Sequence, residues 1–101
     1  PANREQALAM LDRLADVLVE KKDFHRLFDA RMLRKKFELG LALNRPSSLG
    51  DVPENLRKEV EATYVEAARE AGRRYLEAGE IGQAWTYFQV LREPEPVAMT
   101  G

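Results

Sequence analysis

Residues 65–96, VEAAREAGRRYLEAGEIGQAWTYFQVLREPEP, contain the pattern that decides the fold of this chain. Small residues fill the first half of the stretch, and Gly79 separates it from a second apolar run. A small residue such as Gly72 lets a neighbouring helix approach closely. The rings of Tyr75 and Phe88 would then fill the space between the two helix axes. The stretch therefore predicts two antiparallel helices joined by a tight turn.

The same spacing resembles one unit of the tetratricopeptide repeat (TPR) family. With Val65 as the first position, the residues that match the family pattern are Gly72, Tyr75, Gly79, Ala84, Phe88 and Pro96. Two positions depart from it, because Ala68 replaces the usual large residue and Ala71 replaces a leucine. The resemblance implies a TPR-like helical hairpin rather than a standard repeat, with a role in protein interaction.

Composition narrows the class of protein. A chain of 101 residues with 45% hydrophobic and 33% charged residues fits one globular helical domain with a modest core. A net charge of −1 provides no general field for nucleic acid or for an acidic membrane. The absence of cysteine excludes disulfides and cysteine-based metal sites. Without a signal peptide or a membrane-spanning run, the predicted location is cytoplasmic.

Hydrophobic periodicity predicts an all-α fold of four antiparallel helices, as TPR-like helical hairpins in a bundle. The predicted helices run from about Asn3 to Glu20, from Asp23 as N-cap to about Gly40, from about Val52 to Ala78, and from about Ile81 to Arg92. They group into hairpin 1 at about 3–43, a loop at 44–52, and TPR-like hairpin 2 at about 53–93. We expect one helical domain over residues 1–101, either complete or as a fragment of a longer chain.

Two local contacts are also expected. Asp51 and Glu54 have the spacing of a capping box around Pro53, at the start of the third helix. In hairpin 2, Gly72 and Ala84 are predicted to face each other across the two helices, since both are small.

The two hairpins align when the chain is shifted by 57 residues, the interval between Leu18 and Tyr75. Further pairs brought together by this shift are Phe24 with Ile81, Leu27 with Ala84, and Phe28 with Trp85. The hairpins are either distant copies of each other or two amphipathic hairpins that align by chance. The sequence leaves both alternatives open.

Catalytic groups are scarce. The single histidine, His25, shares a helix face with Asp29, but no second histidine completes a usual metal site. Ser47 and Ser48 have no neighbouring base that would make either a nucleophile. The sequence therefore predicts no enzyme activity, no cofactor and no metal site in this chain.

A basic cluster provides a candidate contact with phosphate or with an acidic peptide. Its members are Arg31, Arg34, Lys35 and Lys36, within two turns of the second predicted helix, and a second cluster of Arg73 and Arg74 lies in the third predicted helix. No aromatic residues are placed to stack on bases beside it. We therefore expect a protein or peptide partner, and neither nucleic acid nor membrane.

The TPR resemblance implies where such a partner would bind. Ligand contacts in the family come from the first helix of each unit, and the corresponding positions here are Glu66, Arg69, Arg73 and Leu76. The lysine and asparagine set that clamps a C-terminal carboxylate in the family is absent. Arg69 and Arg73 can still hold a carboxylate by forked hydrogen bonds. The alternative is two exposed arginines with acidic neighbours.

The last predicted helix has more apolar surface than one neighbour can cover. Its expected inner face consists of Ile81, Ala84, Phe88 and Leu91. Trp85 and Tyr87 then fall on opposite sides of that face. We expect part of Trp85 or Tyr87 to form an exposed patch used by a second copy, a partner or a following segment.

These patterns predict a TPR-like module for protein–protein interaction or scaffolding, with no catalysis of its own. The alternative is a non-catalytic helical domain of a larger enzyme or regulatory protein. A longer parent chain would favour that alternative.

Overall fold

The computed structural model describes residues 2–92 of the chain. It contains four helices: α1 (Ala2–Glu20), α2 (Phe24–Glu38), α3 (Glu54–Glu77) and α4 (Ile81–Arg92). No strand occurs between residues 2 and 92. The predicted all-α fold of four helices is confirmed.

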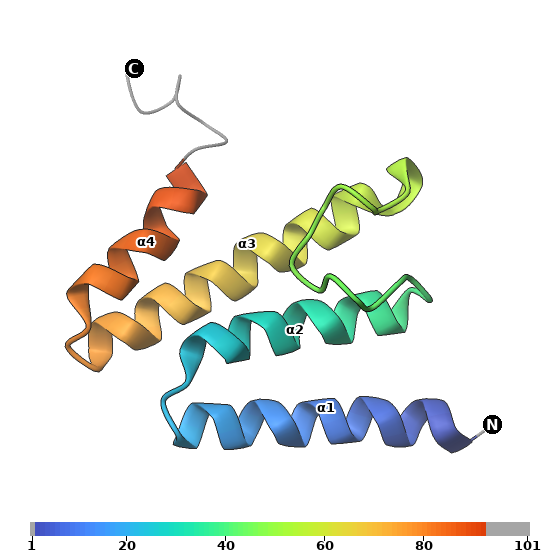
Figure 1. Ribbon diagram of the computed structural model, residues 1–101, viewed down its shortest axis with the longest axis horizontal. Helices are drawn as coiled ribbons and strands as arrows, with labels where there is room; N and C mark the ends of the chain where they lie inside the picture. Colours follow the sequence, from blue (N-terminus) through green and yellow to red (C-terminus); the bar gives the residue numbers. More distant parts are fainter. Residues whose placement is uncertain (1, 93–101) are drawn as a thin grey trace.

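The helices form a layer one helix thick. Extensive contacts join α1 to α2, α2 to α3 and α3 to α4, so each helix packs on its neighbour in the sequence. Figure 1 shows this arrangement, with successive helices running in opposite directions. The principal extents of 49 × 35 × 17 Å agree with a flat, open array. Helices α1 and α4 therefore stand at the two ends of the layer.

Two tight turns make the hairpins. Lys22 between α1 and α2 has a φ of 59°, and Gly79 between α3 and α4 has a φ of 83°. Left-handed residues of this kind commonly end helices. At the start of α2, the Asp23 side chain accepts a hydrogen bond from the backbone N–H of Arg26, as expected of an N-cap.

The connection between the hairpins, residues 39–53, differs from the expected capping box. The N-cap of α3 is Pro53, and no side chain caps this end. Asp51 instead accepts a hydrogen bond of 3.0 Å from Nζ of Lys36. Leaving the fully buried ammonium group of Lys36 without this carboxylate would cost more than leaving the start of α3 without a side-chain cap, because Pro53 already fixes the backbone there.

Aromatic side chains at the centre of the layer connect the two hairpins. The Phe24 ring of α2 lies edge-on to Tyr75 of α3, with centroids 5.2 Å apart. Phe28 lies 5.2 Å from Tyr64 and 5.5 Å from Tyr87, so it touches both α3 and α4. Around these rings, small residues of α3 are fully buried: Ala68, Ala71 and Gly72. The burial of these small residues agrees with the prediction, whereas the rings of Phe24 and Phe28 were not part of the predicted wedge of Tyr75 and Phe88.

Two details of the α3–α4 contact correct the sequence expectations. A Cβ atom added to Gly72 would lie 2.9 Å from Cε1 of Phe88, so Gly72 faces Phe88 rather than Ala84. Ala84 is buried as expected, but Ile81 is exposed although it was assigned to the inner face. Ile81 is the first residue of α4, and its side chain stays exposed at this end of the helix.

The close contact at Gly72 and the open space at Gly82 predict opposite effects on stability when each glycine is replaced by alanine. Gly72→Ala should destabilise the chain, because overpacking costs about 1–3 kcal/mol and exceeds the roughly 1 kcal/mol gained in helix propensity. Gly82→Ala in α4 meets nothing within 4 Å and should stabilise it by about 0.4–1 kcal/mol. Urea unfolding measures the free energy of unfolding of both variants and of the unmodified chain. Equal stabilisation by the two substitutions would contradict the tight contact with Phe88.

Candidate functional site

The partner-binding residues predicted from the sequence lie along one side of α3. Glu66, Arg69, Arg73 and Leu76 are all exposed there, and we call them the α3 stripe. Three of them line a shallow hollow of about 490 Å³. The complete lining of this α3 hollow is Glu66, Arg69, Glu70, Arg73, Arg74 and Glu77. Leu76 belongs to the same stripe but is not part of the lining.

Ion pairs fix the side of the hollow that faces α2. Glu70 accepts two hydrogen bonds from Arg31 of α2, at 3.0 and 3.1 Å, and one of 3.0 Å from Arg74. Burial alone would raise the pKa of Glu70, but the hydrogen bonds from both arginines outweigh it, so its pKa is lowered. The hydrogen bonds between Arg31 and Glu70 raise the pKa of Arg31. Glu70 is therefore ionised at neutral pH and already satisfied.

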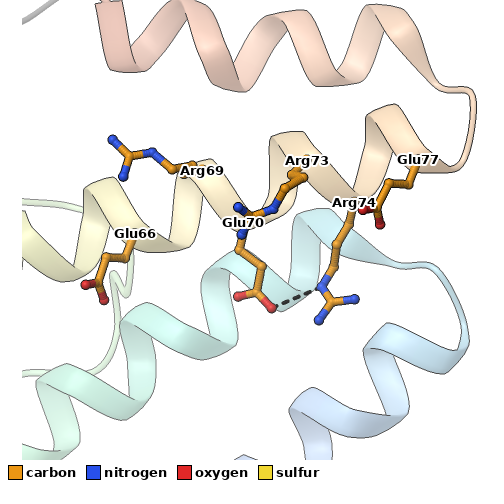
Figure 2. A pocket seen from close by; sticks show the side chains of 6 residues that line it. All are labelled: Glu66, Arg69, Glu70, Arg73, Arg74 and Glu77. Carbon is orange, nitrogen blue, oxygen red and sulfur yellow. Dashed lines mark hydrogen bonds and ion pairs between the residues drawn. The ribbon is translucent and has the colours of Figure 1, made fainter.

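Arg69 and Arg73 differ from Arg74 in their ion pairing. Among residues 2–92, no carboxylate lies within ion-pair distance of either guanidinium group, whereas Arg74 is held by Glu70. Figure 2 shows Glu70 and Arg74 on the side of α3 towards α2, with Arg69 extending away from that side. Two cations four residues apart on an exposed helix side are neighbours in space. They can hold one anionic group between them.

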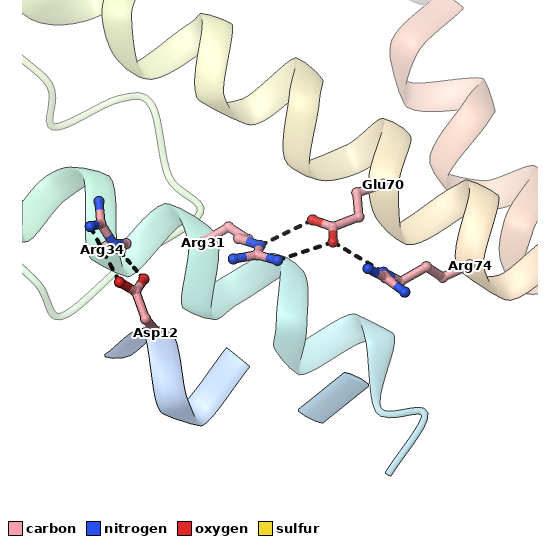
Figure 3. Close-up of polar contacts among 5 residues, drawn as sticks. All are labelled: Asp12, Arg31, Arg34, Glu70 and Arg74. Carbon is pink, nitrogen blue, oxygen red and sulfur yellow. Dashed lines mark hydrogen bonds and ion pairs between the residues drawn. The ribbon is translucent and has the colours of Figure 1, made fainter. Parts of the chain in front are cut away.

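The basic cluster of α2 is not an open positive patch. Arg34 donates to Asp12 of α1, with an N–O distance of 2.7 Å, and Arg31 is bound by Glu70. Figure 3 shows these pairs extending across three helices. Lys35 approaches Glu38 at 3.7 Å, and Lys36 is fully buried. The expectation that these four residues form a surface for phosphate or an acidic peptide is wrong, since each one already has an acidic partner within the chain.

Lys36 was the hardest of these residues to predict. Its ammonium group donates to the carbonyl oxygens of Arg45 and Ser48, each at 2.7 Å, as well as to Asp51. The three donors of the ammonium group are thereby used. The bond from Lys36 lowers the pKa of the Asp51 carboxyl. Lys36 thus holds the loop between the hairpins in place.

His25 makes a contact that the sequence did not indicate. Its Nδ1 lies 2.6 Å from the Tyr87 hydroxyl of α4. Burial raises the pKa of the Tyr87 phenol, so the hydroxyl is protonated at neutral pH and donates whenever Nδ1 carries no proton. The pair ties α2 to α4. Within the described part of the chain, no group of three potential metal ligands is found.

The patch expected on α4 forms around only one of its two aromatic residues. Trp85 is exposed, but Tyr87 is buried among Phe28, Tyr75 and His25. The expectation of an exposed Tyr87 is wrong, because α2 as well as α3 covers this side of α4. Whether another molecule uses Trp85 stays a prediction.

A second hollow, between α1 and α2, was not predicted. It has a volume of about 460 Å³ and an almost entirely apolar lining: Ala7, Met10, Leu11, Leu14, Leu33, Phe37 and Leu43. The sequence feature that could have indicated this hollow is Met10, an apolar residue outside the predicted apolar face of α1. Helices long and apolar enough to cross a bilayer are absent from residues 2–92.

Comparisons with known proteins add no relative from which a role can be transferred. No family model, curated protein or solved structure matches the chain. The TPR resemblance therefore rests on residue spacing alone, and the function has to be argued from the surface of α3.

Proposed function

We propose that the chain is a TPR-like protein-interaction module that binds a segment of a protein partner through one central carboxylate, along the α3 stripe. The observation that supports this proposal best is the pair Arg69 and Arg73, two exposed guanidinium groups without an ion pair among residues 2–92. On the neighbouring side, Arg31 of α2 and Arg74 of α3 are both paired with Glu70 within the fold.

The chemistry of the α3 hollow specifies the kind of segment. A guanidinium group binds a carboxylate through two parallel hydrogen bonds, so Arg69 and Arg73 favour an aspartate, a glutamate or a carboxy terminus. Glu66 and Glu77 at the two ends of the hollow repel further acidic residues. Leu76 offers an apolar contact on the adjoining turn. The preferred partner is therefore a peptide with a central carboxylate flanked by basic or apolar side chains, rather than nucleic acid or membrane.

The proposal assigns no catalytic role to the chain. The lining of the α3 hollow consists of arginine and glutamate side chains, and no serine, threonine, cysteine, lysine or histidine lies among them. A cysteine-free composition fits a scaffold that works in the reducing cytoplasm.

A peptide selection followed by titration tests the proposal. Random peptides with free carboxy termini are selected on the immobilised chain, and the best binder is titrated by fluorescence anisotropy. Arg69→Glu/Arg73→Glu should raise its Kd at least about tenfold, a loss of about 1.4 kcal/mol. Circular dichroism should report unchanged helicity, because both side chains are exposed.

A matched control separates the site from net charge. Arg13→Glu/Lys58→Glu reverses the same number of charges at exposed positions of α1 and α3. At physiological salt, where screening acts within about 8 Å, it should change the Kd less than about twofold. An equal effect of the two double variants, or no effect of either, would remove the α3 stripe as the binding site.

A further inference from the structure

The two hairpins share one backbone register in their turns. The shift of 57 residues that aligns their sequences also places Lys22 on Gly79, the two left-handed residues. The backbone N–H of Asp23 donates to the carbonyl oxygen of Leu18 at 2.9 Å, and the backbone N–H of Glu80 donates to that of Tyr75 at 2.8 Å. Each donor and acceptor pair corresponds under the same shift. Equivalent positions of α2 and α4 can therefore be compared directly.

Positions equivalent between α2 and α4 differ sharply in exposure. Phe24 and Phe28 of α2 are 5% and 6% exposed, because Tyr75 and Tyr64 of α3 cover them. Their counterparts on α4, Ile81 and Trp85, are 61% and 51% exposed. Leu27 and Ala84, which face the partner helix inside each hairpin, are both buried. Helix α4 thus exposes the side on which α2 carries the next helix.

Helix α1 exposes the complementary side. The same shift places Met10, Leu14 and Val17 on Ala67, Ala71 and Arg74 of α3. Ala67 lines a small space together with Arg31 of α2, and Arg74 shares Glu70 with that arginine, so this side of α3 faces α2. Ala67 and Ala71 are buried, whereas Met10, Leu14 and Val17 are all exposed.

We propose that a second copy of this chain packs its α1 on α4, in the register in which α3 packs on α2. In this register, the contacts of Phe24 with Tyr75 and of Phe28 with Tyr64 correspond to contacts of Ile81 with Leu18 and of Trp85 with Ala7 of the next copy. The exposed residues Met10, Leu14 and Val17 lie on the same side of α1 as Ala7 and extend this contact. These observations specify a second copy as the partner. The contact between α2 and α3 exists inside the chain, α4 repeats the α2 half of this contact, and α1 repeats the α3 half. Exposed apolar surface on both end helices would be removed from water together.

Head-to-tail contact of this kind has a distinctive consequence. The two surfaces are different, so each copy keeps one of them open after pairing. The contact is heterologous, and copies add into a chain or a closed ring rather than stopping at a symmetric dimer. This assembly leaves the α3 stripe uncovered, so it is independent of the proposed peptide site.

Sedimentation velocity of the 101-residue chain over a range of concentrations tests the assembly. The average mass of the unmodified chain should rise with concentration beyond that of a dimer. Met10→Glu and Trp85→Glu should each abolish self-association, since each places a charge in one half of the contact. An equal mixture of the two variants should form a heterodimer and nothing larger, because each retains the surface that the other lacks.

Control variants and contrary outcomes make the test decisive. Ala9→Glu and Gln83→Glu introduce the same charge at exposed positions on other sides of α1 and α4, and should associate like the unmodified chain. Melting curves recorded at low concentration check that all variants fold. The proposal is overturned if the unmodified chain stays monomeric, if Met10→Glu still dimerises, or if the mixture of Met10→Glu and Trp85→Glu stays monomeric.

Discussion

Phe28→Ala is expected to lower the free energy of unfolding by about 3–5 kcal/mol, the usual cost of truncating a buried phenylalanine. Phe28 is almost fully buried, and its ring touches Tyr64 of α3 and Tyr87 of α4. Its removal opens a cavity where three helices meet. In a layer this thin, few other side chains can fill the gap.

Urea unfolding followed by circular dichroism measures this loss. Met10→Ala truncates a large apolar residue of α1 that is mostly exposed, and at concentrations too low for self-association it should change stability by no more than about 0.5 kcal/mol. Similar losses at Phe28 and Met10 would show that the aromatic cluster is not the main connection between the hairpins.

Lys36→Met is expected to cost about 2–4 kcal/mol, although methionine keeps most of the buried stem. The substitution removes the donor that binds two loop carbonyls and Asp51. Those carbonyls then lose a charged hydrogen-bond partner, and residues 39–53 should exchange their amide protons faster.

The neighbouring lysine is the natural control. Lys35→Met removes a surface pair with Glu38, in which the nearest N–O distance is 3.7 Å, and should cost less than about 1 kcal/mol. Denaturant midpoints and hydrogen exchange of both variants distinguish the two roles. If Lys35→Met proves as costly as Lys36→Met, the buried ammonium group does not anchor the loop.

Helix positions were predictable because each helix buries one side against a neighbour in the sequence. Apolar residues at helical spacing and Asp23 as N-cap located all four helices, and α4 has the predicted bounds of Ile81 and Arg92. The bounds of α3 were less accurate. The capping box proposed at Asp51 and Glu54 uses only local spacing, whereas Asp51 is bound by a lysine fifteen residues away.

The periodicity of a single helix cannot predict that a residue is buried when the burial depends on contact with a third helix. Tyr87 lies to one side of the contact between α3 and α4, and the sequence did not indicate that α2 reaches this position. The α3 stripe, in contrast, was taken from the TPR resemblance, and the exposure of Glu66, Arg69, Arg73 and Leu76 agrees with it. What this stripe binds depends on the partner, whose residues this sequence does not contain.

The binding role of α3 is tested most directly by a double-mutant cycle between Arg73 and the central carboxylate of a selected peptide. Arg73→Gln and the change of the peptide carboxylate to its amide are titrated singly and together. The proposal predicts a coupling free energy of at least about 1 kcal/mol, because each change removes the same forked hydrogen bond. Effects that add within about 0.3–0.5 kcal/mol would contradict direct contact between the peptide carboxylate and Arg73.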